Sequence, residues 1–346
     1  MTVRFGVIGC GVIAYWTHLR ELKGLPGVRL VAAADPDPAA RERASRLAGI
    51  PTHASAPELL ARSDIDAVVI SAPSHLHADL AIAAVCARKH VYLEKPVATN
   101  AADGRRLQEA VRGTGLQVAV GFSRRCHPMY VQARSLIAFG ALGEIRTVFT
   151  SFNEPIRQDS MPVWKRSRPT GGGVLLDLGS HHTDLLRWFL NSEAAQVEAR
   201  IHSRASEEDE AWTRITMANG VVAQSYFSFC AGRADFLEFI GERGTLRVDR
   251  HHPSLSLKLA RRLGYGVRAA AVFPSRESWA WRIMRLARPS YESSYRRALA
   301  GFAAAISGGT PDGAGLEDGL RSLEIVLAAE EASRRGTPIA LPFDSL

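Results

Sequence analysis

Cysteine is scarce in this sequence, which has 346 residues and four cysteines. Cys10, Cys86, Cys126 and Cys230 lie far apart and form no CxxC pair. We therefore expect neither a disulfide framework nor a zinc cluster, and the reducing cytoplasm is the simplest setting for the protein.

Long apolar runs are also missing. No stretch of about twenty apolar residues occurs, so we expect no segment that crosses a bilayer. The first residues, MTVRFGVIGCG, lack the basic region, apolar run and cleavage site of a signal peptide. Hydrophobic residues make up 46% and charged residues 23%, which is typical of a globular protein, and 346 residues suggest two domains.

The net charge of +8 arises in one segment. Residues 258–297 contain ten Lys or Arg and two Asp or Glu, an excess of eight. Because the remainder is neutral, we expect no nucleic-acid surface. Within this segment ESWAWRIMRLARPS predicts a helix with an apolar face (Trp279, Ile283, Leu286) opposite a basic one (Arg282, Arg285, Arg288). Docking by the apolar face is the simplest interpretation; contact with a membrane surface or a phosphate-bearing substrate is the alternative.

The first 122 residues alternate short apolar runs with helical segments, as a parallel sheet with crossovers requires. The expected strands are 4–10, 29–35, 66–73, 90–95 and 116–122, and the expected helices are 12–24, 38–47, 77–89 and 101–112. Near-continuous Val, Ile and Ala runs predict strands that are buried on both faces.

The pattern changes after residue 122. A helix is predicted at 129–139, followed by strands within 143–154, 196–203, 211–218, 221–229, 234–241 and 245–249, and by helices at 291–307 and 316–335. Asn219-Gly220 between two of these strands is a strong hairpin signal, so this sheet is mainly antiparallel. We expect a first domain of residues 1–122 and a second of residues 123–346.

A glycine loop joins the first strand to the first helix. Gly9-Cys10-Gly11-Val12-Ile13-Ala14 has the form GxGxxG/A, and its place between strand and helix predicts dinucleotide binding. Gly9 permits the tight turn, Gly11 lets the backbone approach a pyrophosphate, and N–H groups at the helix start, around Val12 and Ile13, hold the phosphates.

The position of Asp35 bears on whether the cofactor is NAD or NADP. It ends the second strand, where an acid binds the ribose hydroxyls of NAD and repels the 2′-phosphate of NADP. NAD is therefore expected, although Arg41 and Arg43 lie close enough in sequence to leave NADP open.

Several stretches together resemble one family. They are GVIGCGVIA, APSHLHADLAIAA, HVYLEKPVA, GGGVLLDLGSHHTD and, more weakly, FIGERGTLRVD, and they cover the chain from its start to about Asp249. In order and spacing they resemble the Gfo/Idh/MocA oxidoreductases, the group of glucose–fructose oxidoreductase and inositol dehydrogenase. The resemblance implies an α/β fold: an N-terminal Rossmann domain with a doubly wound parallel sheet, then a C-terminal α+β domain with a large open sheet. It also implies a nicotinamide cofactor, a sugar, cyclitol or related polyol substrate, and homodimers or homotetramers formed through the exposed sheet.

Lys95 stands at the carboxyl end of the fourth strand, the edge where doubly wound sheets bind ligands. Pro96 confines it to an extended backbone. A solvated surface charge is the default interpretation of such a lysine, but the resemblance implies that Lys95 is the catalytic-site lysine and also contacts the cofactor. It further places Glu94 and the turn of Ser71, Ala72 and Pro73 against the cofactor.

Two residues that follow this turn, Ser74 and His77, also bear on the cofactor site. Ser74 stands where many members have Asn, so one polar contact differs. His77 matches a frequent family histidine, and it either caps the following helix or contacts the cofactor.

The paired histidines of GGGVLLDLGSHHTD separate by helical phase. On a helix over residues 173–190, Asp177, His181 and Asp184 share one stripe, whereas His182 falls among leucines. Imidazole titrates near neutral pH, so His181 is the candidate acid/base, Asp177 its supporting acid and Asp184 a structural carboxylate. His182 is expected to be a buried, hydrogen-bonded core residue. A zinc site is unnecessary beside the Lys95 ammonium, and no metal is expected.

The roles of two residues just upstream of the glycine run remain open. Trp164 and Lys165 resemble a Trp-Arg/Lys pair found before the glycine run, and they either line the substrate mouth or are a loop Trp and a solvated Lys.

The sequence therefore predicts an NAD(P)-dependent oxidoreductase acting on the CH–OH group of a sugar, a cyclitol or a sugar-derived alcohol or ketone, nucleotide-linked sugars included. Either Lys95 or His181 is the immediate proton partner. The alternatives are an NAD-dependent glycosidase that uses transient oxidation and a non-catalytic protein that senses the cofactor.

Overall fold

The structure, a computed structural model, describes residues 2–156, 160–250, 254–260, 267–272, 293–311 and 313–343. These residues form two compact units. The first contains the described residues up to Cys126 and those in 293–323; the second contains those from His127 to 272 and 324–343. The domain boundary expected between residues 122 and 123 stays a prediction.

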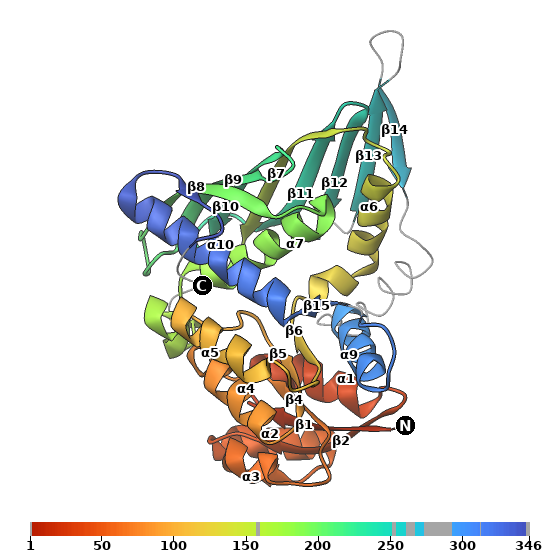
Figure 1. The fold of residues 1–346 in the computed structure, drawn as a ribbon, viewed down its shortest axis with the longest axis vertical. Helices are drawn as coiled ribbons and strands as arrows, with labels where there is room; N and C mark the ends of the chain where they lie inside the picture. Colours follow the sequence, from red (N-terminus) through yellow and green to blue (C-terminus); the bar gives the residue numbers. More distant parts are fainter. Residues whose placement is uncertain are drawn as a thin grey trace. The chain divides into compact units, whose positions relative to one another are not determined.

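The first unit is built on a seven-stranded sheet (Figure 1). The strands are β1 (Val3–Ile8), β2 (Val28–Ala34), β3 (Thr52–His53), β4 (Ala67–Ile70), β5 (His90–Leu93), β6 (Val118–Val120) and β15 (Ala314–Gly315). Their order is β15-β6-β5-β4-β1-β2-β3, and every neighbouring pair except β15–β6 is parallel. The strand order reverses between β1 and β4, which is the switch point where doubly wound sheets bind ligands.

Helices cover this sheet on the connections between its strands. They are η1 (Ala14–His18), α1 (Leu19–Lys23), α2 (Pro38–Ala48), α3 (Ala56–Leu60), η2 (Ser74–Leu76), α4 (His77–Cys86), α5 (Ala101–Val111), η3 (Ser123–Cys126) and α9 (Ser293–Ile306). Helix α1 contacts α2 and α9, whereas α4 contacts α3 and α5. These two groups follow from right-handed crossovers that run in opposite directions from β1.

The second unit contains a nine-stranded sheet. Its strands are β7 (Ile145–Asn153), β8 (Ala194–His202), β9 (Glu210–Met217), β10 (Val222–Ser228), β11 (Ala234–Gly241), β12 (Gly244–Asp249), β13 (Ser254–Ala260), β14 (Val267–Val272) and β16 (Ile339–Ala340). The order is β14-β13-β12-β11-β7-β10-β9-β8-β16, and β7–β10 is the parallel pair in an otherwise antiparallel sheet. The hairpin predicted at Asn219-Gly220 is confirmed, since β9 and β10 pair antiparallel across it.

Helices pack against one face of this second sheet (Figure 1). The helices of this unit are α6 (Pro128–Ala138), η5 (Val163–Lys165), η6 (Arg168–Thr170), η7 (Leu175–Gly179), α7 (Ser180–Leu190) and α10 (Leu316–Arg335), whose first eight residues belong to the first unit. Helix α6 contacts β12 and β13, and η7 contacts β7 and β10. The basic helix expected around residues 279–288 lies outside the described residues, and among those described no helix is long and apolar enough to cross a membrane.

Candidate active site

Four adjacent strands of the first unit deliver the predicted residues to one edge of the sheet. β5, β4, β1 and β2 are parallel neighbours, and each is followed at its carboxyl end by predicted site residues. Lys95 follows β5, Ser71 follows β4, Gly9 follows β1 and Asp35 follows β2. Because parallel strands end at the same edge, the fold brings these four residues together.

The glycine loop has the shape that a dinucleotide needs. Gly9 has φ +90°, and a Cβ there would lie 2.7 Å from the carbonyl carbon of Ser71, so only glycine fits. A Cβ on Gly11 would meet nothing within 4 Å, so open space lies in front of this residue. The helical run that begins at Val12 has its first N–H groups beyond the reach of its own carbonyls. The loop therefore fits a pyrophosphate.

Asp35 holds the glycine loop as well as facing the cofactor edge. One carboxylate oxygen accepts a hydrogen bond from the backbone N–H of Cys10 (2.7 Å), and the other accepts one from the N–H of Asp37 (2.8 Å). Arg41 donates to the carbonyl of Asp35, and Arg43 lies 4.0 Å from Asp37. Burial and the nearby Asp35 raise the pKa of the Cys10 thiol to about 12, so the loop carries no thiolate beside the phosphate site.

His77 contacts backbone rather than facing outward. Its side chain is buried, with Nδ1 2.6 Å from the carbonyl oxygen of Pro96 and Nε2 2.9 Å from that of Ala72. Burial lowers the pKa of His77, against the effect of the two carbonyls. His77 therefore links the Ser71–Pro73 turn to the strand end that carries Lys95.

Glu94 also has a partner that the sequence did not reveal. Its Oε1 lies 2.8 Å from Nε2 of His18, which is fully buried in η1. A Cβ on Gly121 would lie 2.7 Å from Glu94 Oε2, so this carboxylate is packed beneath the end of β6. The His18–Glu94 pair thus joins the first helix to the strand end beside Lys95.

In the second unit, Asp177 and His181 lie on one helical run. The predicted helix begins close to residue 173 but contains a π-helical stretch, η7, before α7. Asp177 Oδ2 lies 2.7 Å from the ammonium of Lys165. His181 is half-buried, and its ring centroid is 6.1 Å from that of Phe152. Asp184 is 1% exposed, so it is a buried carboxylate of α7.

The prediction for His182 is confirmed. Its side chain is fully buried, with Nδ1 2.9 Å from Thr150 Oγ1 and Nε2 3.3 Å from Asp235 Oδ1. Phe152 stacks on the ring at 5.6 Å. This histidine anchors α7 to β7 and β11 and leaves His181 as the candidate acid/base.

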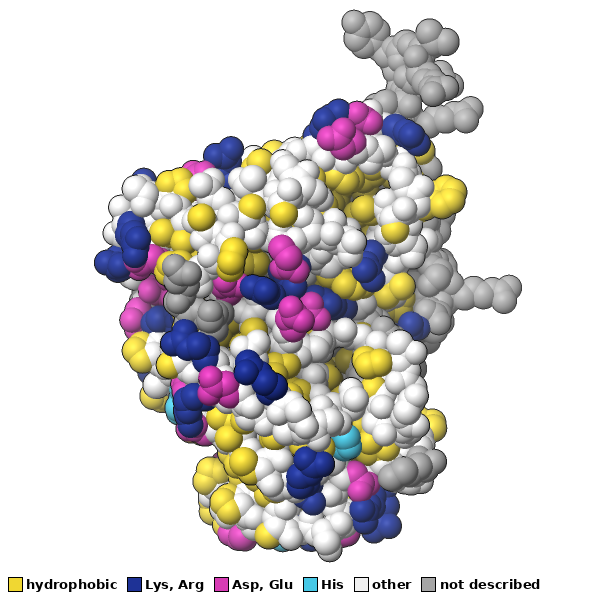
Figure 2. Space-filling view, viewed as in Figure 1, with side chains coloured by type: hydrophobic (Ala, Val, Ile, Leu, Met, Phe, Trp, Pro, Cys, Tyr) yellow, Lys and Arg dark blue, Asp and Glu magenta, His cyan; other side chains and the backbone are white. Residues whose placement is uncertain are grey.

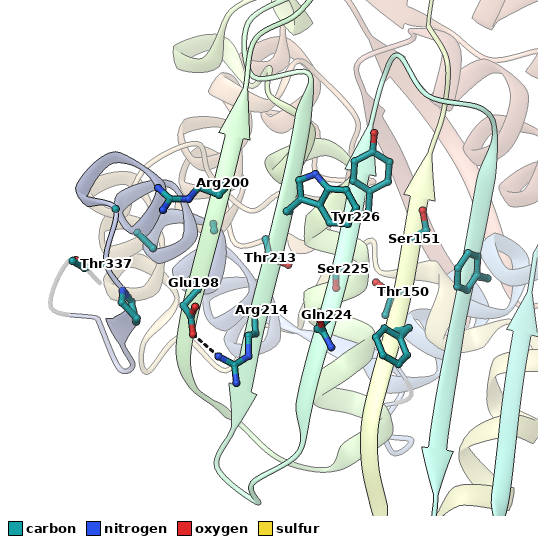
Figure 3. A pocket seen from close by; sticks show the side chains of 17 residues that line it. Thr150, Ser151, Glu198, Arg200, Thr213, Arg214, Gln224, Ser225, Tyr226 and Thr337 are labelled. Carbon is teal, nitrogen blue, oxygen red and sulfur yellow. Dashed lines mark hydrogen bonds and ion pairs between the residues drawn. The ribbon is translucent and has the colours of Figure 1, made fainter.

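A pocket of about 510 Å³ lies on the sheet of the second unit (Figure 3). Successive residues of a strand face opposite sides, and Phe227 contacts His182 of α7, whereas Tyr226 lines the pocket. Trp212 stacks on Tyr226 at 4.3 Å. The pocket is therefore on the face away from α7 and is not the site of Asp177 and His181.

Metal ligands do not gather in the part of the chain that the structure describes, where no group of three or more His, Cys, Asp or Glu side chains could hold an ion.

A parallel sheet whose carboxyl edge carries a dinucleotide loop, an acid after β2 and a lysine after β5 defines a class, the Rossmann-type NAD-binding proteins. Residues 3–122 match the model of an oxidoreductase family with an NAD-binding Rossmann fold, and residues 130–247 match the GFO/IDH/MocA C-terminal domain. The chain is 31% identical to inositol 2-dehydrogenase of Rhizobium meliloti (strain 1021), over 95% of this chain and 96% of that protein. The chain belongs to the Gfo/Idh/MocA oxidoreductase family.

Two further comparisons span most of the chain. The 1,5-anhydro-D-fructose reductase of Ensifer adhaerens is 31% identical over 82% of this chain and 81% of that protein. The WlbA dehydrogenase from Bordetella pertussis, solved with NADH and UDP-GlcNAcA, shares the fold at a TM-score of 0.84, with 24% identity over 99% of each chain. The predicted family, fold class, oxidoreductase activity and NAD cofactor are confirmed.

Proposed function

We propose that this enzyme oxidises or reduces a CH–OH centre of a sugar, a cyclitol or a nucleotide-linked sugar, with Lys95, Asp177 and His181 at the reaction centre. The observation that carries the proposal is the pairing of two features in one family member: a lysine at the cofactor edge and an imidazole four residues after a carboxylate. When bound, NAD supplies the nicotinamide that accepts or returns the hydride.

Each residue has a separate task in this proposal. Gly9 and Gly11 let the loop amides bind the phosphates, and Asp35 binds the ribose hydroxyls. The Lys95 ammonium polarises the reacting oxygen, which stabilises the charge that develops there. His181 takes up the hydroxyl proton in oxidation and returns it in reduction, and Asp177 orients the ring and stabilises its charged form.

The test is a thermal-shift screen with NAD and NADP, followed by absorbance assays of hydride transfer. Probes are myo-inositol with NAD⁺, 1,5-anhydro-D-fructose with NADH, and UDP-GlcNAcA with NAD⁺. A melting shift with NAD and a change in NADH absorbance on one probe class support the proposal. Cleaved product without net NADH would indicate the glycosidase instead, and NAD binding without turnover across a wide polyol panel would indicate a sensor.

The assembly and compartment are part of the proposal. We propose a homodimer or homotetramer in which a second copy covers the aromatic pocket face, since Trp212 there is 54% exposed. We propose a cytoplasmic location, because all four cysteines are free thiols and such thiols persist in a reducing compartment.

A further inference from the structure

Lys165 reaches the proposed reaction centre from a separate loop. Its Nζ lies 2.7 Å from Asp177 Oδ2, and the two side chains are 25% and 12% exposed. An ion pair on open surface contributes little, because water screens it and the side chains lose freedom. This pair is largely withdrawn from water, so its charge has a larger effect on neighbouring groups.

The backbone that carries Lys165 is fixed on the glycine run. Thr170 Oγ1 donates a hydrogen bond to the carbonyl of Trp164 (2.7 Å), and the N–H of Gly172 donates to that of Ser167 (2.9 Å). A Cβ on Gly172 would lie 2.5 Å from the carbonyl oxygen of Lys165. Glycine at this position therefore lets the two segments touch, and the contact sets the direction of Lys165.

Other cations of the same loop have other partners. Arg166 donates to the carbonyl of Met161 (3.0 Å), and Arg168 binds both carboxylate oxygens of Glu330 (2.6 and 2.9 Å). On the opposite side of α7, His182 lies against Asp235. Among the three described cations Lys165, Arg166 and Arg168, the geometry directs Lys165 to Asp177.

We propose that Lys165 is a positioning residue that acts through Asp177 on His181. Its ammonium fixes the direction of the Asp177 carboxylate and offsets its charge, on the helical run that also carries His181. The inference rests on the proposed function, because it assigns His181 the proton.

The charges of Asp177 and Lys165 set the direction in which the titration midpoint of His181 should move in a variant. A carboxylate beside an imidazole favours the imidazolium, and an ammonium on that carboxylate weakens the effect. Lys165→Met removes this counter-charge from Asp177, so the titration midpoint of His181 should move upward by about one pH unit. Lys165→Arg keeps the charge and holds the midpoint close to that of the wild type.

The experiment follows the Hε1 resonance of His181 by NMR as a function of pH, without substrate. His181→Ala identifies the resonance by its loss. Lys165→Met, Lys165→Arg, Asp177→Asn and the double variant Lys165→Met with Asp177→Asn are compared, and NADH binding checks that each is folded. We expect the upward shift in Lys165→Met, its rescue by arginine, and almost none of it in the Asp177→Asn background.

Two results would overturn the inference. One is an unchanged His181 midpoint in Lys165→Met. The other is an equal shift with and without Asp177, which would mean that Lys165 does not act through it. The titration is measured without substrate, so its result does not depend on turnover. Near-normal turnover of His181→Ala would contradict the proposed function, whereas the titration alone decides whether Lys165 acts through Asp177.

Discussion

His77 shows how one buried side chain can hold two strand ends. A neutral imidazole has one N–H, yet both nitrogens of His77 lie within hydrogen-bond distance of carbonyl oxygens. Those carbonyls belong to Ala72, in the cofactor turn, and Pro96, next to Lys95. The residue therefore acts on the cofactor through backbone that it positions.

Replacing His77 is expected to weaken cofactor binding. His77→Ala removes the one N–H that the ring donates to these two carbonyls and frees the turn. The dissociation constant of NADH should therefore rise about tenfold, since 1.4 kcal/mol is about the cost of one lost buried hydrogen bond. Fluorescence titration with NADH measures this. His202→Ala, at an exposed position of β8, is the matched control. Equal NADH affinity in both variants would refute the role.

Residues with a local signal were predictable, and residues with distant partners were not. Gly9, Gly11 and Asp35 sit at fixed positions in a strand–loop–helix unit, so their sequence spacing predicts their place. Glu94 and His18 are 76 positions apart, and nothing in either neighbourhood indicates the pair. Lys165 could be noticed before the glycine run, but only the folded loop brings it to Asp177.

At the scale of elements, two positions of the glycine loop require glycine for different physical reasons. Gly9→Ala is expected to destabilise the fold, because its Cβ would clash with Ser71 backbone at a positive φ. Gly11→Ala is expected to keep its stability, since its Cβ meets open space, and to lose NADH binding, since that space takes the pyrophosphate. Thermal melts with and without NADH separate the two. Equal melting losses in both variants would contradict this division.

The segment before β9 is expected to make stability depend on pH. Burial, followed by repulsion from Glu330, raises the pKa of Glu208 to about 7, while Arg168 opposes this at 3.9 Å. A carboxyl whose folded pKa lies above its unfolded value stabilises the fold at low pH and loses this as pH rises through about 7. With 28% of the side chain exposed, solvent screening reduces the effect to about 1–2 kcal/mol.

Urea unfolding at pH 5 and pH 8 measures that dependence. The free energy of unfolding should be lower at pH 8, and Glu208→Gln, which stays neutral, should reduce the difference by about 1–2 kcal/mol. The same pH difference in wild type and variant would show that another group is responsible.

Most elements could be predicted from their hydrophobic period, but only some of the strand pairings could. Within the described residues, the predicted strands and helices appear close to where the pattern placed them, including the hairpin at Asn219-Gly220. The strands β3, β13 and β14 were not predicted. The parallel pair β7–β10 left no signal, because alternation is the same in parallel and antiparallel strands. The π-helical stretch before α7 was also missed, since a local change in helical period needs tertiary contacts to hold it.

On the scale of the whole molecule, the described surface in view carries charges of both signs side by side (Figure 2). Figure 2 shows Lys or Arg and Asp or Glu side chains interspersed over the face in view. Helix α9 contacts α1 and η3 although about 170 residues separate it from the end of η3. A contact between residues so far apart in the sequence leaves no local pattern. Sequence alone therefore could not assign α9 to the first unit.

Self-association is expected to depend on the aromatic face of the second unit. Trp212→Asp places a charge on the pocket surface, which a second copy would have to desolvate, so the protein should become monomeric. Light scattering after size exclusion gives the mass. Phe139→Asp, at the 89% exposed residue that caps the carboxyl end of α6, is the control and should keep the wild-type mass. An unchanged mass for Trp212→Asp would place the interface elsewhere.

The most direct test of the account is the turnover of His181→Ala. On the probe that the wild type uses best, kcat for hydride transfer, followed by NADH absorbance, should fall by about 10²–10⁴-fold, the usual contribution of a positioned acid/base. The dissociation constant of NADH should stay within about twofold of the wild type, since a twofold change is only about 0.4 kcal/mol. A kcat close to that of the wild type, with NADH bound normally, would contradict the assignment of His181.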